Sequence, residues 1–158
     1  MIDGGIIVED DSPSPWVAAG HFVPKKSKDG QMRTRLVVDF RRLNSVIERP
    51  IRGFPSLQEL RANVEKDSKY YFCCDLVDGY HQVRLSKEAS KYTTFIVSTG
   101  HGARTFRWLR CPQGLASSED IFNERSDRAF SKLDGTVKLV DDVFCQAQDW
   151  PTFMERVR

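Results

Sequence analysis

The sequence has no long apolar run and no leader typical of a secreted or membrane protein. No stretch approaches the roughly 18 consecutive apolar residues of a membrane-spanning helix, and no basic region followed by an apolar segment opens the chain. The cysteines lack CxxC spacing, and adjacent Cys73 and Cys74 would point to opposite faces of a strand, which argues against a shared zinc site. We therefore predict an intracellular protein, not secreted and without a membrane partner. All four cysteines are predicted to be small buried apolar residues: Cys73, Cys74, Cys111 and Cys145.

The bulk composition is that of a folded domain. The chain has 158 residues, of which 40% are hydrophobic and 29% charged, and its length suits one domain or two small lobes. The net charge is only +2, but the segment from His21 to Arg52 carries nine basic and three acidic residues. Such a segment suits a phosphate-bearing partner, although a solvated basic loop explains it equally well.

Hydrophobic periodicity and turn residues predict a mixed α+β fold. Ser56 and Glu59 have capping-box spacing, which predicts a helix over 56–65. A second helix is predicted over 118–132, with acids in its first turn. Strands are predicted at 16–23, 35–40, 70–75, 80–85, 93–99 and 104–110, with a hairpin turn around Asp29-Gly30. Hairpins alternating with single helices favour α+β.

Three acids follow apolar strand-like runs. Asp141 and Asp142 lie between apolar β-formers, which predicts two strands joined by a tight turn, and Asp75 ends the 70–75 run. If these strands pair, three carboxylates meet at one point and need a divalent cation to offset their repulsion. Such clusters serve two-metal phosphoryl transfer. Taken alone, an Asp-Asp pair in a turn is more often only a polar turn.

Five motifs occur together and in order over about residues 5–150. Their combination closely resembles the reverse transcriptase domain of retroviruses and, more narrowly, of gypsy-type LTR retrotransposons. The motifs are Arg35-Leu36-Val37-Val38-Asp39-Phe40-Arg41-Arg42-Leu43-Asn44, Phe54-Pro55-Ser56, Asp75-Leu76-Val77-Asp78-Gly79-Tyr80-His81-Gln82-Val83, Pro112-Gln113-Gly114-Leu115-Ala116-Ser117-Ser118 and Leu139-Val140-Asp141-Asp142.

The resemblance implies the fingers and an incomplete palm of a right-hand polymerase, without a thumb. The fingers would be 1–48 and 83–117, and the palm 49–82 and 118–158, with an antiparallel palm sheet backed by helices near 56–65 and 118–131. The implied activity is RNA-directed DNA polymerisation within a retrotransposon Pol polyprotein. The implied partners are an RNA or DNA template with its primer, dNTPs, and the remaining thumb, RNase H and integrase parts of Pol. The implied location is the cytoplasm or a virus-like particle.

The resemblance also implies the site residues and the cofactor. Two Mg²⁺ ions, replaceable by Mn²⁺, would be held by three catalytic acids and one backbone carbonyl: Asp75, Asp141, Asp142 and Leu76. The implied nucleotide-binding residues are Lys26, Arg35, Tyr80 and Gln113. Lys25 is the alternative to Lys26 as the phosphate lysine. Tyr80 would be the steric gate against ribonucleotides, with a half-buried strand aromatic as its alternative, and Gln113 has a loop amide as its alternative.

Two departures from the family pattern support a different interpretation. Leu139 stands where the family has tyrosine, and the chain stops before a thumb. The alternative function is a truncated, inactive remnant that at most binds nucleic acid. A viral RNA-templated RNA polymerase is disfavoured by Tyr80 and by the Leu-Val-Asp-Asp turn. We predict structural roles for His81 and Phe40 and core positions for the tryptophans, Trp16, Trp108 and Trp150.

Overall fold

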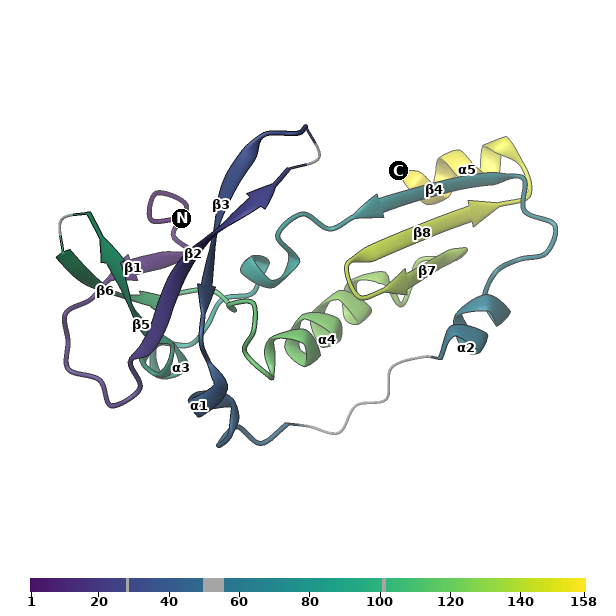
Figure 1. The fold of residues 1–158 in the computed structure, drawn as a ribbon. Coiled ribbons are helices and arrows are strands. Elements are labelled where there is room, and N and C mark those ends of the chain that lie inside the picture. The colour runs from purple at the N-terminus through teal and green to yellow at the C-terminus, as the bar shows by residue number, and fades with distance from the viewer. Residues whose placement is uncertain (28, 50–55, 101) are drawn as a thin grey trace. The chain divides into compact units, whose positions relative to one another are not determined.

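The computed structural model describes residues 1–27, 29–49, 56–100 and 102–158 (Figure 1). The chain divides into two compact units. The first comprises Met1–Arg49 and Tyr80–Ser118, and the second Pro50–Gly79 and Glu119–Arg158. Their assignment to fingers and palm stays a prediction. Lys28, Arg52 and the Phe54-Pro55 part of one motif lie outside the described residues.

The first unit is built on a five-stranded sheet in the order β1-β6-β5-β2-β3. All neighbours are antiparallel except β2 and β5, which pair in parallel through Ala18–Gly20. The strands are β1 (Ile7–Glu9), β2 (Ala18–Lys26), β3 (Met32–Val38), β5 (Thr94–Thr99) and β6 (Gly102–Trp108), and the helices are α1 (Arg41–Asn44) and α3 (Lys87–Tyr92).

The core of the first unit is aromatic. Phe95 is fully buried, and its ring lies 5.7 Å from the ring centroids of both Phe106 and Trp108. Phe40 is only 2% exposed and belongs to the same cluster, as predicted. His81 stacks on Trp108 with centroids 5.4 Å apart, which supports a structural role for this imidazole.

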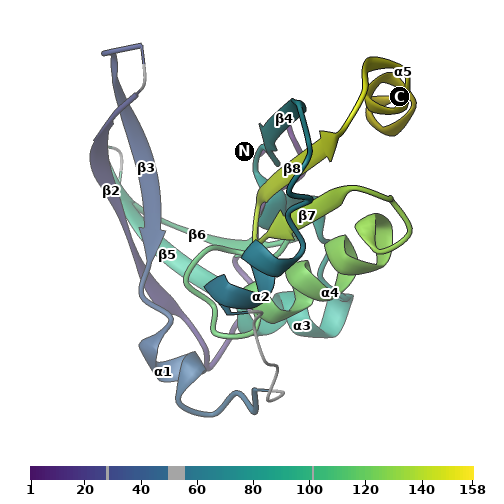
Figure 2. The same cartoon turned by 90° about the vertical axis from the view of Figure 1, so that its right-hand side faces the viewer.

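The second unit is built on an antiparallel three-stranded sheet in the order β4-β8-β7 (Figure 1). Its strands are β4 (Tyr70–Asp75), β7 (Thr136–Leu139) and β8 (Asp142–Ala147), and its helices are α2 (Leu57–Ala62), α4 (Ser118–Phe130) and α5 (Trp150–Val157). Figure 2 shows α4 beside the sheet, where Lys138 of β7 forms an ion pair with Asp127 of α4. The predicted capping box of Ser56 and Glu59 is present at the start of α2.

Gln146 is the polar centre of the second unit. It is fully buried, and its side chain donates to the Asn63 carbonyl at 2.9 Å and accepts from the Glu65 amide at 3.1 Å. These bonds join the end of α2 to β8. Arg156 of α5 donates to the Gln146 carbonyl and, at 3.2 Å, to Glu65. One buried amide and one guanidinium therefore connect the chain after α2, β8 and α5.

The strand predicted at 80–85 is absent. Gly79–Gln82 forms a 3₁₀ turn, η1, and Arg84 makes a single bridge to Arg110. The alternation at 80–85 reflects burial rather than strand pairing, since Val83 is 4% exposed. Gly79, the first residue of this turn, packs closely against α4, because a Cβ there would lie only 2.7 Å from the ring of Phe122.

The expectations for the cysteines and for Trp150 are corrected. Cys73 is exposed and Cys74 is partly exposed, because β4 is an edge strand; only Cys111 and Cys145 are buried. Trp150 is 54% exposed rather than in the core, since it lies at the start of α5 and contacts Tyr70 and Phe153 with one part of its ring. Helix α5, for which the sequence yielded no prediction, begins at Trp150. Asp149 is its N-cap, whose side chain accepts from the Thr152 amide, and Pro151 lies in its first turn. In the described part of the chain, no helix is long and apolar enough to cross a membrane.

Candidate active site

The three predicted acids lie at one end of the sheet in the second unit. Asp75, the last residue of β4, is directly opposite Asp142, the first residue of β8. Asp142 is in turn opposite Leu139 of β7. Because cross-strand partners point to the same face, Leu139, Asp142 and Asp75 form one row across the sheet. The three acids are exposed, and Leu139 is 42% exposed.

Asp141 belongs to the two-residue turn that joins β7 to β8. Val140 has φ +55°, whereas Asp141 does not have a positive φ. These signs are those of a type II′ turn, in which glycine is the preferred first residue. A β-branched residue in this conformation is strained. The Leu76 amide donates to the Asp141 carbonyl at 2.8 Å, so the end of β4 is fixed to the turn.

The chemistry of these residues fits a hard divalent cation. Carboxylates and backbone carbonyls are the ligands that Mg²⁺ prefers. Asp75, Asp141 and Asp142 supply three carboxylates, and Leu76 is adjacent to Asp141 through its amide. Within the described residues, no three His, Cys, Asp or Glu side chains are grouped so that they could hold a metal ion. The backbone therefore gathers the acids at one sheet end, whereas their carboxylates do not form a finished cage.

The first unit brings together two of the predicted nucleotide-binding residues. Arg35 of β3 donates a side-chain hydrogen bond to Gln113, which is 78 residues away in sequence. The loop that carries Gln113 is fixed by Asn44, whose side chain donates to the Gly114 carbonyl at 2.9 Å and accepts from the Ala116 amide at 2.8 Å. No role was predicted for Asn44, because its hydrogen-bond partner is 70 residues away in the sequence.

The hairpin of β2 and β3 separates the two candidate lysines. Val23 is opposite Arg35, and Lys25 is opposite Arg33. Since side chains alternate along a strand, Lys25 shares the face of Arg35, whereas Lys26, opposite Met32, points to the other face. Tyr80, the remaining predicted residue, lies in η1 and is partly buried.

The end of β3 carries an exposed ion pair. Hydrogen bonds from the Arg41 side chain and backbone, followed by the charges of Arg41 and His21, lower the pKa of Asp39 to about 2. Asp39 is therefore ionised throughout the neutral range. Its bonds to the first residue of α1 fix the direction in which the chain leaves β3.

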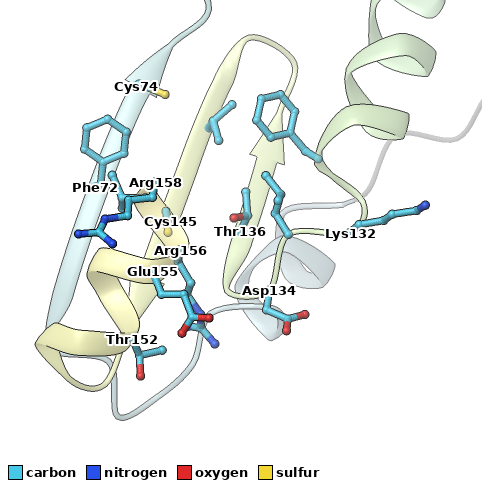
Figure 3. A pocket seen from close by; sticks show the side chains of 14 residues that line it. Phe72, Cys74, Lys132, Asp134, Thr136, Cys145, Thr152, Glu155, Arg156 and Arg158 are labelled. Carbon is cyan, nitrogen blue, oxygen red and sulfur yellow. The ribbon is translucent and has the colours of Figure 1, made fainter.

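A groove of about 630 Å³ opens elsewhere in the second unit (Figure 3). Phe72, Cys74, Cys145 and Val143 of the sheet line it, together with the end of α4 and residues of α5. None of the three acids lines it. The groove is therefore separate from the predicted metal site, whose carboxylates lie at the exposed end of the sheet.

The acid turn, Val140-Asp141, and the strand before it carry two features that the sequence did not indicate. Val140 has the left-handed backbone conformation, and Lys138 donates a hydrogen bond to the Val140 carbonyl at 3.3 Å. A left-handed valine contradicts its own propensity, so no sequence pattern identifies it. Lys138 looks in sequence like an ordinary exposed strand lysine.

Solved structures that are similar to this chain include foamy viral reverse transcriptases. A foamy viral protease–reverse transcriptase in complex with an RNA/DNA hybrid superimposes with a TM-score of 0.77 at 20% identity, over 97% of this chain and 19% of that chain. The same type of enzyme in complex with double-stranded DNA gives a TM-score of 0.78 at 19% identity, over 99% of this chain and 30% of that one. At such identity the likeness establishes the fold.

Sequence comparison establishes the family. The family described as reverse transcriptase (RNA-dependent DNA polymerase) matches residues 23–150, and the chain belongs to this family. The retrovirus-related Pol polyprotein from transposon opus of Drosophila melanogaster is 31% identical over 164 residues, covering 100% of this chain. The Pol polyprotein from transposon gypsy of the same organism is 33% identical over 136 residues, covering 84% of this chain. The chain spans only 15% and 13% of the lengths of these relatives.

Proposed function

We propose that this chain is the fingers and part of the palm of an RNA-directed DNA polymerase within a gypsy-type retrotransposon Pol polyprotein. The observation that carries the proposal is the register of the second sheet, which sets Asp75 opposite Asp142 and next to the turn residue Asp141. The membership of the reverse transcriptase family supports the same reaction. That reaction is template-directed addition of dNTPs to a primer 3′-hydroxyl, inside the cell or in a virus-like particle.

The three acids would hold the metal ions. When bound, two Mg²⁺ ions supply Lewis-acid activation of the primer hydroxyl and neutralise charge on the leaving pyrophosphate. Asp75, Asp141 and Asp142, together with the Leu76 carbonyl, would hold the ions. The exposed end of the sheet leaves these groups open to nucleic acid and nucleotide.

Residues of the first unit would bind the incoming dNTP. Arg35 carries a planar fork of donors suited to a triphosphate, and Gln113 is joined to it by a hydrogen bond. Tyr80 would exclude a ribose 2′-hydroxyl by its bulk. The template and primer would be RNA or DNA. Foamy viral relatives of this fold have been solved with an RNA/DNA hybrid and with double-stranded DNA.

Mn²⁺ is expected to raise the melting temperature of the chain. At about ten times its Kd, a ligand adds about 1.4 kcal/mol to the stability of the folded state, which shifts Tm by about 3–6 °C in a chain of this size. The measurement is thermal unfolding with and without MnCl₂. An Asp75→Asn/Asp141→Asn variant should show no such shift. Equal shifts in the two proteins would exclude the three acids as the metal site.

The strand register supports Lys25 rather than Lys26 as the lysine that contacts phosphate. In a polymerising Pol polyprotein that carries this domain, Lys25→Ala is expected to raise KM for dNTP by about 10-fold or more, since a charge-assisted hydrogen bond contributes about 1.5–3 kcal/mol. Lys26→Ala is the matched control, expected within about threefold of the wild type. Steady-state kinetics of dNTP incorporation measure KM in both variants. A larger increase in Lys26→Ala than in Lys25→Ala would reverse the assignment.

A second candidate function is nucleic-acid binding without polymerisation. Two observations favour it: the described carboxylates do not form a finished metal cage, and Leu139 rather than tyrosine occupies the row of acids. A primer-extension assay combined with a binding assay separates the candidates. Binding of template–primer without Mn²⁺-dependent extension, in a Pol polyprotein that carries this domain, would favour the second.

A further inference from the structure

Lys138 places a buried ammonium group beside the acid turn, Val140-Asp141. Its side chain is 8% exposed, although it belongs to a strand that ends one residue later. Its ammonium group lies 3.0 Å from Asn123 Oδ1 and 3.0 Å from Asp127 Oδ1, both on α4. Its third partner is the Val140 carbonyl, at 3.3 Å. The three donors of one ammonium group therefore reach three oxygens, one of which belongs to the turn.

The Val140 carbonyl belongs to the central peptide of that turn. Types I′ and II′ both need a positive φ at the first turn residue, and they differ in the orientation of this peptide. In type I′ the second residue, here Asp141, also has a positive φ. A hydrogen bond that holds the Val140 carbonyl on the side of α4 thus sets the backbone conformation of Asp141 as well. The direction of its carboxylate follows from that conformation.

Val140 is a residue whose backbone conformation such a contact would stabilise. Glycine at this position would favour type II′ without assistance, whereas valine disfavours any conformation with a positive φ. The strain at Val140 has to be offset by its surroundings. The described structure offers one side-chain contact to the Val140 carbonyl, from Lys138, and Lys138 is in turn fixed by Asn123 and Asp127.

We propose that Lys138 is a positioning residue of the metal site, which holds the strained Val140-Asp141 turn in the form that presents Asp141 to the cation. This inference rests on the proposed function, because it assigns the acids to metal binding. The competing explanation is that Lys138 only joins β7 to α4. The two differ in what Val140→Gly does: glycine supplies the type II′ preference by itself, and it leaves the contacts of Lys138 with α4 in place.

The test is a titration of the whole chain with Mn²⁺, in which the electron paramagnetic resonance signal measures the concentration of free Mn²⁺. Lys138→Met is expected to weaken Mn²⁺ binding about 5-fold or more. The direction is diagnostic, because removal of a nearby positive charge by itself would strengthen cation binding. Lys132→Met is the charge-matched control at an exposed lysine after α4, and it should bind Mn²⁺ as tightly as the wild type or more tightly.

The double variant separates positioning from packing. Lys138→Met/Val140→Gly is expected to bind Mn²⁺ within about twofold of Val140→Gly alone, since glycine keeps the turn without the lysine. If Lys138→Met lowers Mn²⁺ affinity as much in the Val140→Gly background as in the wild type, the proposal is overturned in favour of simple packing against α4. Unchanged or tighter binding by Lys138→Met would also overturn it.

A readout without metal keeps failure of this inference distinct from failure of the proposed function. A left-handed residue gives a strong NOE between its own amide and α protons. Lys138→Met should change this NOE at one of the two turn residues: it becomes weaker at Val140 if the positive φ is lost, or stronger at Asp141 if the central peptide turns to the type I′ orientation. The dispersion of the remaining amide signals shows that the fold persists. If the wild type binds Mn²⁺ no better than Asp75→Asn/Asp141→Asn, the proposed function fails, and the NOE still decides whether Lys138 holds the turn. Unchanged NOEs at both Val140 and Asp141 would sink the inference.

Discussion

Asp141→Asn, in a polymerising Pol polyprotein that carries this domain, is expected to lower kcat for dNTP incorporation by about 10³-fold or more. Asparagine keeps the size of the side chain and removes the charge that would hold two cations. Lewis-acid stabilisation of a transition state contributes several kcal/mol, and about 4 kcal/mol corresponds to a factor of about 10³ in rate. The measurement is single-turnover primer extension at saturating dNTP.

Asp134→Asn is the matched control for this substitution. Asp134 is an exposed acid two residues before the first residue of β7, seven positions from Asp141 and outside the row of acids. We expect its extension rate to stay within about twofold of the wild type, as for surface substitutions in general. Template–primer affinity should change little in either variant, because phosphate contacts from basic residues dominate it. More than a tenth of the wild-type rate in Asp141→Asn would exclude Asp141 as a metal ligand.

Gln146→Ala is expected to lower the free energy of unfolding by about 2–4 kcal/mol. The substitution leaves a cavity at a fully buried position, and it leaves the Asn63 carbonyl and the Glu65 amide without their partner. Both effects act in the second unit. The unfolding transition that reports on β8 and α5 should therefore shift to a lower urea concentration. Urea denaturation followed by circular dichroism measures the change, with the slope m expected to stay constant.

Gln148→Ala provides the comparison. Gln148 is exposed and lies one residue beyond β8, so its removal should change stability by less than about 0.5 kcal/mol. A loss below about 1 kcal/mol in Gln146→Ala would mean that water replaces the two hydrogen bonds and fills the space. The buried amide would then not be the connection between the end of α2 and β8.

Local patterns predicted the elements whose signals are local. The capping box at Ser56, the strand at 70–75 and the hairpin that carries Asp141 and Asp142 all follow from neighbouring residues. The prediction failed at 80–85, where Val83 and His81 are placed by packing rather than by pairing. It also failed for Cys73, because the position of β4 at the edge of its sheet depends on the order of strands.

The sequence by itself determined the family and predicted the three acids as its metal site. Five motifs in register specify a reverse transcriptase domain, and Asp75, Asp141 and Asp142 follow from residue identity and spacing. Only the tertiary structure decided which residues face each other: Asp75 opposite Asp142, Lys25 on the face of Arg35, and Lys138 on the Val140 carbonyl. The reason is physical. A shift of one residue in strand register turns every side chain to the other face, and register depends on contacts between segments distant in sequence.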